Sequence, residues 1–320
     1  MAIELEPDEI RRRWGPLFCK DLVTLVDGEQ IEIIEQCSAR GPVEWDAVNR
    51  TRAGGVAKEV WVEGNTLHLL ATVGHEPVSF GPVDVEMGGQ ALEGVEVKGE
   101  KVITHWAGVG GAGLLGACLG QAPGVDRAIF RSAHDLEMGG SHCCRVSLVT
   151  PKMERVTVGV DDTDTRESGA TWALALRIGR ETPAPTKLLK HRIVQLYPRA
   201  AHRTTNCVST ALIFATPTPT ELIEFLREKL RGETKSEETH IAIWMGLSIP
   251  PELQRFGQRA KSEEIPLEDA HAIARQLGIE HYPITGERGL IGALAALGYS
   301  RAGIEAAALP HDLRGGAIRD

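Results

Sequence analysis

The pattern of hydrophobic residues changes once along the chain, between Pro151 and Glu154. Upstream, short alternating apolar runs are separated by turn pairs such as Asp27–Gly28, which predicts strands joined by hairpins. Downstream, β-branched runs alternate with helical apolar stripes, a pattern typical of mixed α and β structure. Because 320 residues are many for a single core, we expect an α+β protein of two domains, residues 1–153 and 154–320.

The downstream half can be divided into elements. A proline at the first helical position, with Thr218 and Glu221 as a capping box, predicts a helix from Pro219. Gly278 is a stop signal for another helix. We predict strands at 155–160, 192–197, 208–215 and 240–245, and helices that start near Ser168, at Pro219, near 267 and near 287. The stretches 75–94 and 232–240 are polar and are predicted to be loops, the second of them merely solvated.

Composition limits the class of protein. With 42% hydrophobic and 25% charged residues, the chain has ordinary globular composition, and no stretch approaches the roughly 18 apolar residues of a membrane span. The first residues lack the apolar core of a secretory signal, so we expect a cytoplasmic protein with no membrane partner. The formal charge of −9 argues against a polyanion-binding surface, so nucleic acid is predicted to be an unlikely partner. A homo-oligomer is compatible with the sequence.

Three acidic residues follow the predicted strand 155–160, namely Asp161, Asp162 and Asp164. Carboxylates this close repel one another unless a cation or several hydrogen-bond donors lie among them. The following helix start attracts anions, while the aspartates attract Mg²⁺, so the segment suits a metal-bridged phosphate. Ser168, Gly169 and Thr171 would let the phosphate approach closely. The alternative is that one aspartate caps the helix and the others are surface turn residues.

Three stretches resemble a known family. GVDDTDTRESGATW is similar to the DDTD signature of the archaeal tRNA-Ile agmatidine synthetases, in which a phosphorylatable threonine comes seven residues after the last aspartate. IVQLYPRAAHRTTN and ERGLIGALAALGY resemble two further blocks of that family in the same order. The likeness covers about residues 155–300, and it implies a DDTD kinase-like α/β core with a ferredoxin-like part in the second domain.

The resemblance also implies roles for individual residues. Asp161, Asp162 and Asp164 would hold Mg²⁺ and the ATP phosphates, and Thr171 would be a phosphoacceptor or a phosphate hydrogen-bond donor. Nucleotide or substrate contacts would come from Ser168, Gly169, Arg203, Asn206, Arg288 and Gly289. Surface salt bridges are the alternative role for the two arginines.

The chain also departs from the synthetases. It has no zinc-ribbon cysteines, and its additional strand-rich α+β domain precedes the DDTD signature. That arrangement resembles methanogenesis marker protein 11, a family of methanogenic archaea. The resemblance implies an ATP- and Mg²⁺-dependent phosphotransferase-like or ligase-like enzyme that activates a small-molecule or protein substrate, in methanogen-specific metabolism or in cofactor or protein maturation. A noncatalytic nucleotide-binding assembly factor is the alternative.

Two features of the first domain suggest other chemistry. Gly108, Gly110 and Gly113 match G-x-G-x-x-G after a predicted strand, which would suit a nicotinamide or flavin oxidoreductase, although a closely packed small-residue helix also explains them. The run His142–Cys143–Cys144 could ligate a soft metal or act as a redox pair. The alternative is the edge of a strand with alternate side chains buried.

Overall fold

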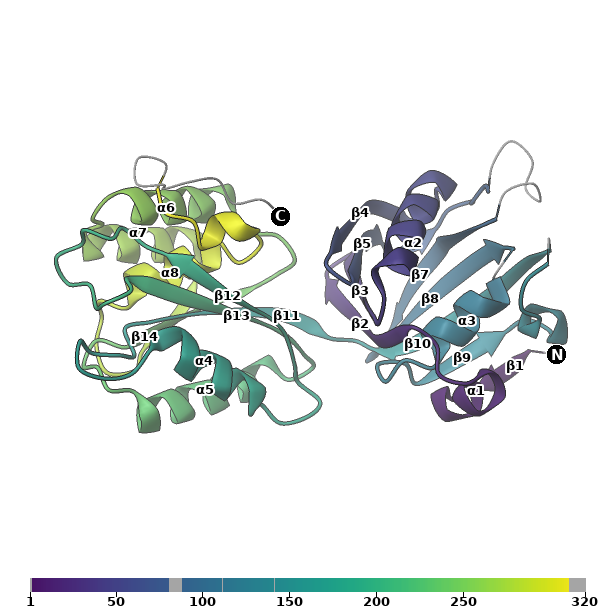
Figure 1. Ribbon diagram of the computed structural model, residues 1–320, viewed down its shortest axis with the longest axis horizontal. Coiled ribbons are helices and arrows are strands. Elements are labelled where there is room, and N and C mark those ends of the chain that lie inside the picture. Colours follow the sequence, from purple (N-terminus) through teal and green to yellow (C-terminus); the bar gives the residue numbers. More distant parts are fainter. Residues whose placement is uncertain (1, 81–87, 111, 141, 311–320) are drawn as a thin grey trace. The chain divides into compact units, whose positions relative to one another are not determined.

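The computed structural model describes residues 2–80, 88–110, 112–140 and 142–310 (Figure 1). The chain divides into two compact units, which we call unit 1 (Met1–Met153) and unit 2 (Glu154–Asp320). Both units are mixed α and β structures built on antiparallel sheets, which confirms the α+β fold class. Within the described residues, no helix is both long and apolar enough to cross a membrane.

Unit 1 contains two antiparallel sheets. The larger has the order β1-β9-β10-β8-β7-β6 and the smaller the order β2-β3-β5-β4. The strands are β1 (Ile3–Leu5), β2 (Cys19–Asp27), β3 (Gln30–Cys37), β4 (Ala57–Glu63), β5 (Thr66–Thr72), β6 (Gly74–His75), β7 (Gly89–Lys98), β8 (Lys101–Val109), β9 (Arg127–Phe130) and β10 (Cys143–Pro151). The helices are α1 (Pro7–Trp14), α2 (Arg40–Ala53), α3 (Ala112–Gly120) and the 3₁₀ helix η1 (Ala133–Leu136).

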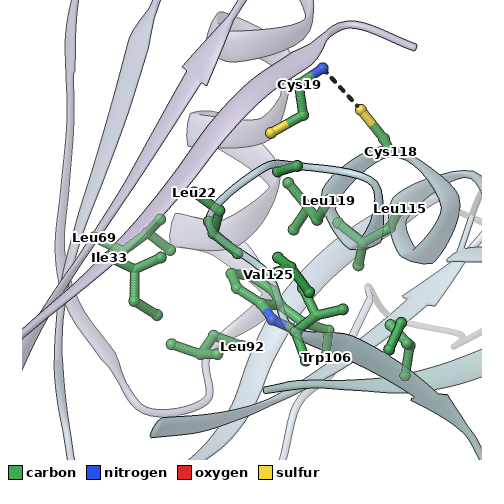
Figure 2. Packing of buried hydrophobic residues seen from close by; sticks show 14 of the residues in the cluster. Cys19, Leu22, Ile33, Leu69, Leu92, Trp106, Leu115, Cys118, Leu119 and Val125 are labelled. Atoms are coloured by element: carbon green, nitrogen blue, oxygen red, sulfur yellow. Dashed lines mark hydrogen bonds between the residues drawn. The ribbon is translucent and has the colours of Figure 1, made fainter. Parts of the chain in front are cut away.

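The core of unit 1 lies where the two sheets and α3 meet, as Figure 2 shows. Trp106 of β8 is fully buried there, together with Leu22 of β2, Leu69 of β5 and Leu119 of α3. Trp106, Leu22 and Leu69 come from strands, on which successive side chains point to opposite faces of the sheet, and Leu119 comes from the helix. The predicted loop 75–94 is wrong at its C-terminal end, because β7 begins at Gly89 and pairs with β8.

Unit 2 is a single antiparallel sheet covered on both faces. The strand order is β12-β13-β11-β14-β15, with β11 (Glu154–Asp161), β12 (Lys187–Gln195), β13 (Val208–Thr216), β14 (His240–Met245) and β15 (Glu280–Pro283). The helices are α4 (Thr171–Arg180), α5 (Pro219–Glu233), α6 (Pro251–Ser262), α7 (Leu267–Leu277), α8 (Leu290–Gly298) and the 3₁₀ helix η2 (Ile304–Ala306). Helices α4 and α5 cover one face of the sheet, and α6, α7 and α8 cover the other (Figure 1). A separate hydrophobic cluster joins the sheet to each of these two groups of helices.

The start of one helix in unit 2 and the cap of another differ from the sequence prediction. Helix α4 begins at Thr171, whereas the predicted start was near Ser168. Helix α5 begins at Pro219 as predicted, but the Thr218 side chain makes no capping hydrogen bond. The proline at the first helical position, whose fixed backbone angle suits a helix, is therefore the start signal that the structure retains.

Candidate active site

The buried centre of unit 2 is β11, which lies between β13 and β14 and ends at Asp161. Side chains alternate along a strand, so Val156, Val158 and Val160 pack against the cluster of α4 and α5. The same alternation turns Asp161 toward α8, on the opposite face of the sheet. Asp161 is 8% exposed and pairs in register with His240 of β14. The end of β11 thus places the Asp161 carboxylate in the interior of unit 2.

Helix α8 approaches β11 so closely that glycine is required at the contact. A Cβ atom added to Gly292 would lie 1.7 Å from Oδ2 of Asp161, and one added to Gly159 would lie 2.0 Å from the Ala293 carbonyl oxygen. The carboxylate therefore lies directly against the first turn of α8. Backbone N–H groups at a helix start carry partial positive charge, so this position favours an anion.

Asp162 directs the chain out of the strand and faces a cavity. Its φ of 53° lies in the left-handed region, which aspartate and asparagine tolerate better than most residues. Its carbonyl oxygen accepts a hydrogen bond of 2.6 Å from the Thr239 hydroxyl. Burial raises the pKa of Asp162 to about 6, although the nearby Arg288 acts to lower it. Burial and then the charge of Asp162 raise the pKa of Asp161 well above its ordinary value.

Asp164 and Thr171 lie in a separate hydrogen-bonded group. The Thr171 hydroxyl donates to Oδ1 of Asp164 at 2.7 Å and accepts from the backbone N–H of Thr163 at 3.1 Å and from its hydroxyl at 3.2 Å. Thr171 is 2% exposed. Within the described residues, the three aspartates do not form a group whose ligand atoms all lie within 4.8 Å of one another. The structure therefore does not bring Asp161, Asp162 and Asp164 together around a single point.

The cavity next to Asp161 and Asp162 has a volume of about 710 Å³. Its lining includes two arginines, Arg203 and Arg288, and His202. Acidic side chains outnumber them, namely Asp161, Asp162, Glu237, Glu238, Glu263, Glu264 and Glu287. Arg288 donates a hydrogen bond to Glu238 at 2.8 Å. Burial raises the pKa of Glu238, but the bonds to Arg288 and its charge outweigh burial, so the pKa lies below its ordinary value. The excess of acidic side chains in the lining favours cations over free anions.

The remaining predicted site residues of unit 2 lie at the border of this cavity or away from it. Gly289 is the N-cap of α8 and follows the lining residue Arg288. Asn206 is exposed and is not part of the lining. Ser168 is exposed, and Gly169 lines a smaller hollow of about 290 Å³ beside Thr163. Of the predicted residues, the structure thus gathers Asp161, Asp162, Arg203 and Arg288.

Sequence reasoning missed the contribution of the segment 232–240. This predicted solvated loop carries Glu237 and Glu238, which line the cavity, and Thr239, which bonds to Asp162. The backbone N–H of Lys235 also donates to the Thr163 carbonyl at 2.9 Å. In an antiparallel pair, residues that precede one strand lie beside those that follow the other. Antiparallel pairing of β14 with β11 would therefore have predicted this proximity.

Two histidines, the buried His240 and the half-buried His281, hold the segment that carries Arg288. His240 Nδ1 lies 3.0 Å from the Gly286 carbonyl oxygen, so this nitrogen must be the donor. His240 Nε2 then accepts from Nδ1 of His281, also at 3.0 Å. Burial lowers the pKa of both imidazoles, so both are neutral around pH 7. This fixed arrangement positions residues 286–288 at the cavity wall.

The glycines of the predicted dinucleotide motif lie in unit 1. Gly108 is in β8, Gly110 follows that strand with a φ of 76°, and Gly113 is in α3. Strand β8 runs antiparallel to both of its neighbours, β7 and β10. A Rossmann unit requires parallel strands joined by the crossover helix. The described residues therefore do not form that arrangement around the motif.

Comparison with known proteins identifies a relative that matches nearly end to end and a group of partial ones. Protein MJ0921 of Methanocaldococcus jannaschii is 36% identical over 286 residues, which are 87% of this chain and 93% of that protein. The tRNA 2-agmatinylcytidine synthetases TiaS of Thermococcus sibiricus and Pyrococcus horikoshii are 27% and 30% identical over 153 and 155 residues, which are 46% and 44% of this chain. This chain spans about a third of their length, 36% and 35%.

The match to TiaS lies in unit 2. The family model of the TiaS TCKD domain matches residues 157–221, which include most of β11, α4, β12 and β13. The solved complex of TiaS with its tRNA and ATP is similar with a TM-score of 0.41 and 24% identity, covering 45% of this chain and 36% of that chain. The family-model match and the sequence identities show that the chain is homologous to TiaS over this domain.

These relatives overturn one prediction. The sequence argument took the formal charge of −9 to mean that nucleic acid is an unlikely partner, whereas the homologous synthetases act on a tRNA. Net charge describes the whole surface, and a local contact with RNA needs only a few well-placed groups. The exclusion of nucleic acid is therefore wrong.

Proposed function

Because this chain belongs to the same family as protein MJ0921 of Methanocaldococcus jannaschii and contains a TiaS TCKD domain match, we propose that it is an ATP- and Mg²⁺-dependent phosphotransferase-like or ligase-like enzyme. Unit 2 is the proposed catalytic unit. The cavity beside Asp161 and Asp162 is the proposed site for ATP and the divalent cation.

The observation that carries the proposal is the pair Asp161 and Asp162 at the cavity wall. Burial raises the pKa of both carboxyl groups, so each is costly to ionise without a cation nearby. Carboxylate oxygens are the ligands that Mg²⁺ prefers, and Mg²⁺ is bound through one or two carboxylates together with substrate phosphates. These two residues thus have the donor chemistry for the ion, and Asp164 supports the loop through Thr171.

The charge of the cavity explains why ATP would need the cation. A volume of about 710 Å³ lies within the range of small-molecule sites, but its lining is mainly acidic and would repel free ATP. Bound Mg²⁺ supplies neutralisation of phosphate charge. Arg203 and Arg288 supply positive charge from the protein, with Arg288 oriented by Glu238. Thr171 is retained as a candidate phosphoacceptor, or as a hydrogen-bond donor to a phosphate, and either role would require its present hydrogen bonds to open.

The substrate class follows from the relatives. We include RNA among the substrates to be tested, since the homologous synthetases modify a tRNA. A small molecule or protein of methanogen-specific metabolism is the other candidate, in keeping with the resemblance to methanogenesis marker protein 11 and with the relative from Methanocaldococcus jannaschii.

The direct test is calorimetric titration of the purified chain with ATP, in Mg²⁺ and in EDTA. We expect binding only with Mg²⁺, and we expect Asp162→Asn to weaken it at least tenfold. Asp269→Asn removes an exposed carboxylate of α7 that pairs with Arg259, and it serves as the matched control with unchanged affinity. Equal affinity in EDTA, or in Asp162→Asn, would contradict the proposal. Release of labelled phosphate with archaeal tRNA, or with small-molecule extract, then identifies the substrate class.

A further inference from the structure

A group of potential metal ligands lies in unit 1, outside the proposed ATP site. His134 belongs to η1, Glu137 directly follows η1, and His142 directly precedes β10. One ligand atom from each of the three side chains can be chosen so that all lie within 4.8 Å of one another. Among the residues that the structure describes, no other group of three or more His, Cys, Asp or Glu side chains meets this distance condition.

The distances within the group fit a tetrahedral ion. His134 Nδ1 and Glu137 Oε1 are 3.4 Å apart. Two ligands of a tetrahedral zinc ion with bonds of about 2.0–2.1 Å are separated by about 3.3 Å. The imidazole rings of His134 and His142 have centroids 4.0 Å apart at an interplanar angle of 34°. Two protonated imidazoles at this distance would repel each other, whereas two neutral ones can share a cation.

The ring of His142 provides an independent indication of a metal site. Its Nε2 atom is buried and has no hydrogen-bond partner among the described residues. On the other side of the ring, a Cβ atom at Gly140 would lie 3.1 Å from Nδ1, so the ring is closely packed there. Buried polar nitrogens nearly always have a partner, and a metal ion would supply one.

The backbone around the group is held by a residue that is not itself a ligand. Asp135 Oδ2 accepts from the backbone N–H of Ser132 at 2.9 Å and from its hydroxyl at 2.8 Å. Its Oδ1 accepts from the backbone N–H of Arg145 in β10 at 2.8 Å. These bonds connect η1, which contains His134, to β10, which directly follows His142. Preformed ligand positions reduce the entropy lost on binding an ion.

We propose that His134, Glu137 and His142 bind a divalent transition-metal ion, for which Zn²⁺ is the best fit. Two imidazoles and one carboxylate leave a fourth tetrahedral position for water or another ligand. The side chains of His134 and Glu137 are 57% and 62% exposed, so the ion can enter from solvent. The two cysteines that follow His142 do not belong to the group, because their Sγ atoms do not meet the distance condition with it. The Sγ atom of the buried Cys144 lies 3.9 Å from the His134 carbonyl oxygen instead.

The test uses the untagged full-length chain, stripped of metal by a chelator and titrated with ZnCl₂ against a chromophoric competitor. We expect one equivalent bound with submicromolar Kd, and at least hundredfold weaker binding in His134→Ala and Glu137→Gln. Both side chains are exposed, so these variants should fold. His75→Ala is the matched control, because His75 is also in unit 1, is also 57% exposed and also lies near a glutamate, Glu93, at 3.8 Å. Its affinity should match that of the unaltered chain.

A second measurement separates this ligand set from the adjacent thiols. Co²⁺ in the site should give a tetrahedral visible spectrum without a thiolate charge-transfer band, and Cys143→Ser should leave Zn²⁺ affinity unchanged. Full affinity in His134→Ala, or loss of binding in Cys143→Ser alone, overturns the proposal. Because the site lies in unit 1, the result is independent of whether unit 2 binds ATP.

Discussion

Asp162→Asn should make the metal-free protein more stable at alkaline pH, although it should weaken ATP binding. Burial raises the pKa of Asp162 from 3.8 to about 6, so the folded state resists ionisation of this carboxyl group. At about 1.4 kcal/mol for each pH unit, the difference corresponds to about 3 kcal/mol. We expect about 2–3 kcal/mol, because the side chain keeps some contact with solvent. Asparagine has the same shape, tolerates the left-handed backbone and never ionises.

The gain in stability from Asp162→Asn depends on pH. A carboxyl group with a raised folded-state pKa contributes its full stability below the unfolded pKa and loses it as pH rises through the folded pKa. The variant and the unaltered chain should therefore differ little at pH 4, where both side chains are neutral in the folded state. The gain should appear between pH 4 and about 6 and reach its full value by pH 8. Relief of the repulsion on Asp161 acts in the same direction.

The assay is urea unfolding in EDTA at pH 4 and pH 8, read by hydrogen exchange of the β11 peptide 155–160, which reports on unit 2. Asp269→Asn again serves as the control and should show no such pH-dependent gain. A loss of stability at pH 8 in Asp162→Asn would refute the reasoning, since it would mean that the ionised carboxylate is stabilised by its surroundings.

Three further outcomes follow from the same site. Thr171→Val removes the hydroxyl that joins Asp164 to Thr163 and should lower the free energy of unfolding in urea by about 2–3 kcal/mol, whereas Thr171→Ser should be close to the unaltered chain. If Thr171 also acts in phosphoryl transfer, the valine variant should still bind ATP but lose turnover by about a hundredfold or more. Gly292→Ala places a methyl group on the Asp161 carboxylate and should lower unit 2 stability by about 3 kcal/mol, seen as a lower melting temperature. Mg²⁺ affinity, measured by titration calorimetry, should fall about tenfold between pH 7 and pH 5, because the ion competes with the proton on Asp162, whose pKa is about 6.

Much of the fold could be predicted from the sequence where short apolar or β-branched runs are bounded by turn residues. The hairpin of β2 and β3 and the buried strand β11 are of this kind. Helix α2 could not be predicted in this way, because the residues it buries include Asp46, Asn49 and Arg50 beside Val43 and Ala53. Arg50 is buried through an ion pair with Glu35 of β3, the strand that precedes α2. Such a helix has no apolar stripe for a pattern to detect.

Part of the candidate site could also be predicted from the sequence. Asp161 and Asp162 were accessible to sequence reasoning, because carboxylates directly after an apolar strand are unusual. Glu237 and Glu238 were not, since their place at the cavity depends on β14 pairing with β11. Local patterns describe single elements, and sheet order is set by contacts between distant ones.

The close approach of α8 to β11 also has an evolutionary consequence. Asp161 keeps its buried position only while residue 292 lacks a side chain, although the two residues are far apart in the sequence. A lineage that no longer uses the carboxylate is free to fill the space at residue 292, and a lineage that fills it cannot keep the carboxylate in place. Among descendants of this gene, a side chain at residue 292 should therefore occur only where residue 161 has changed too, which makes the pair a marker for members that keep the proposed site.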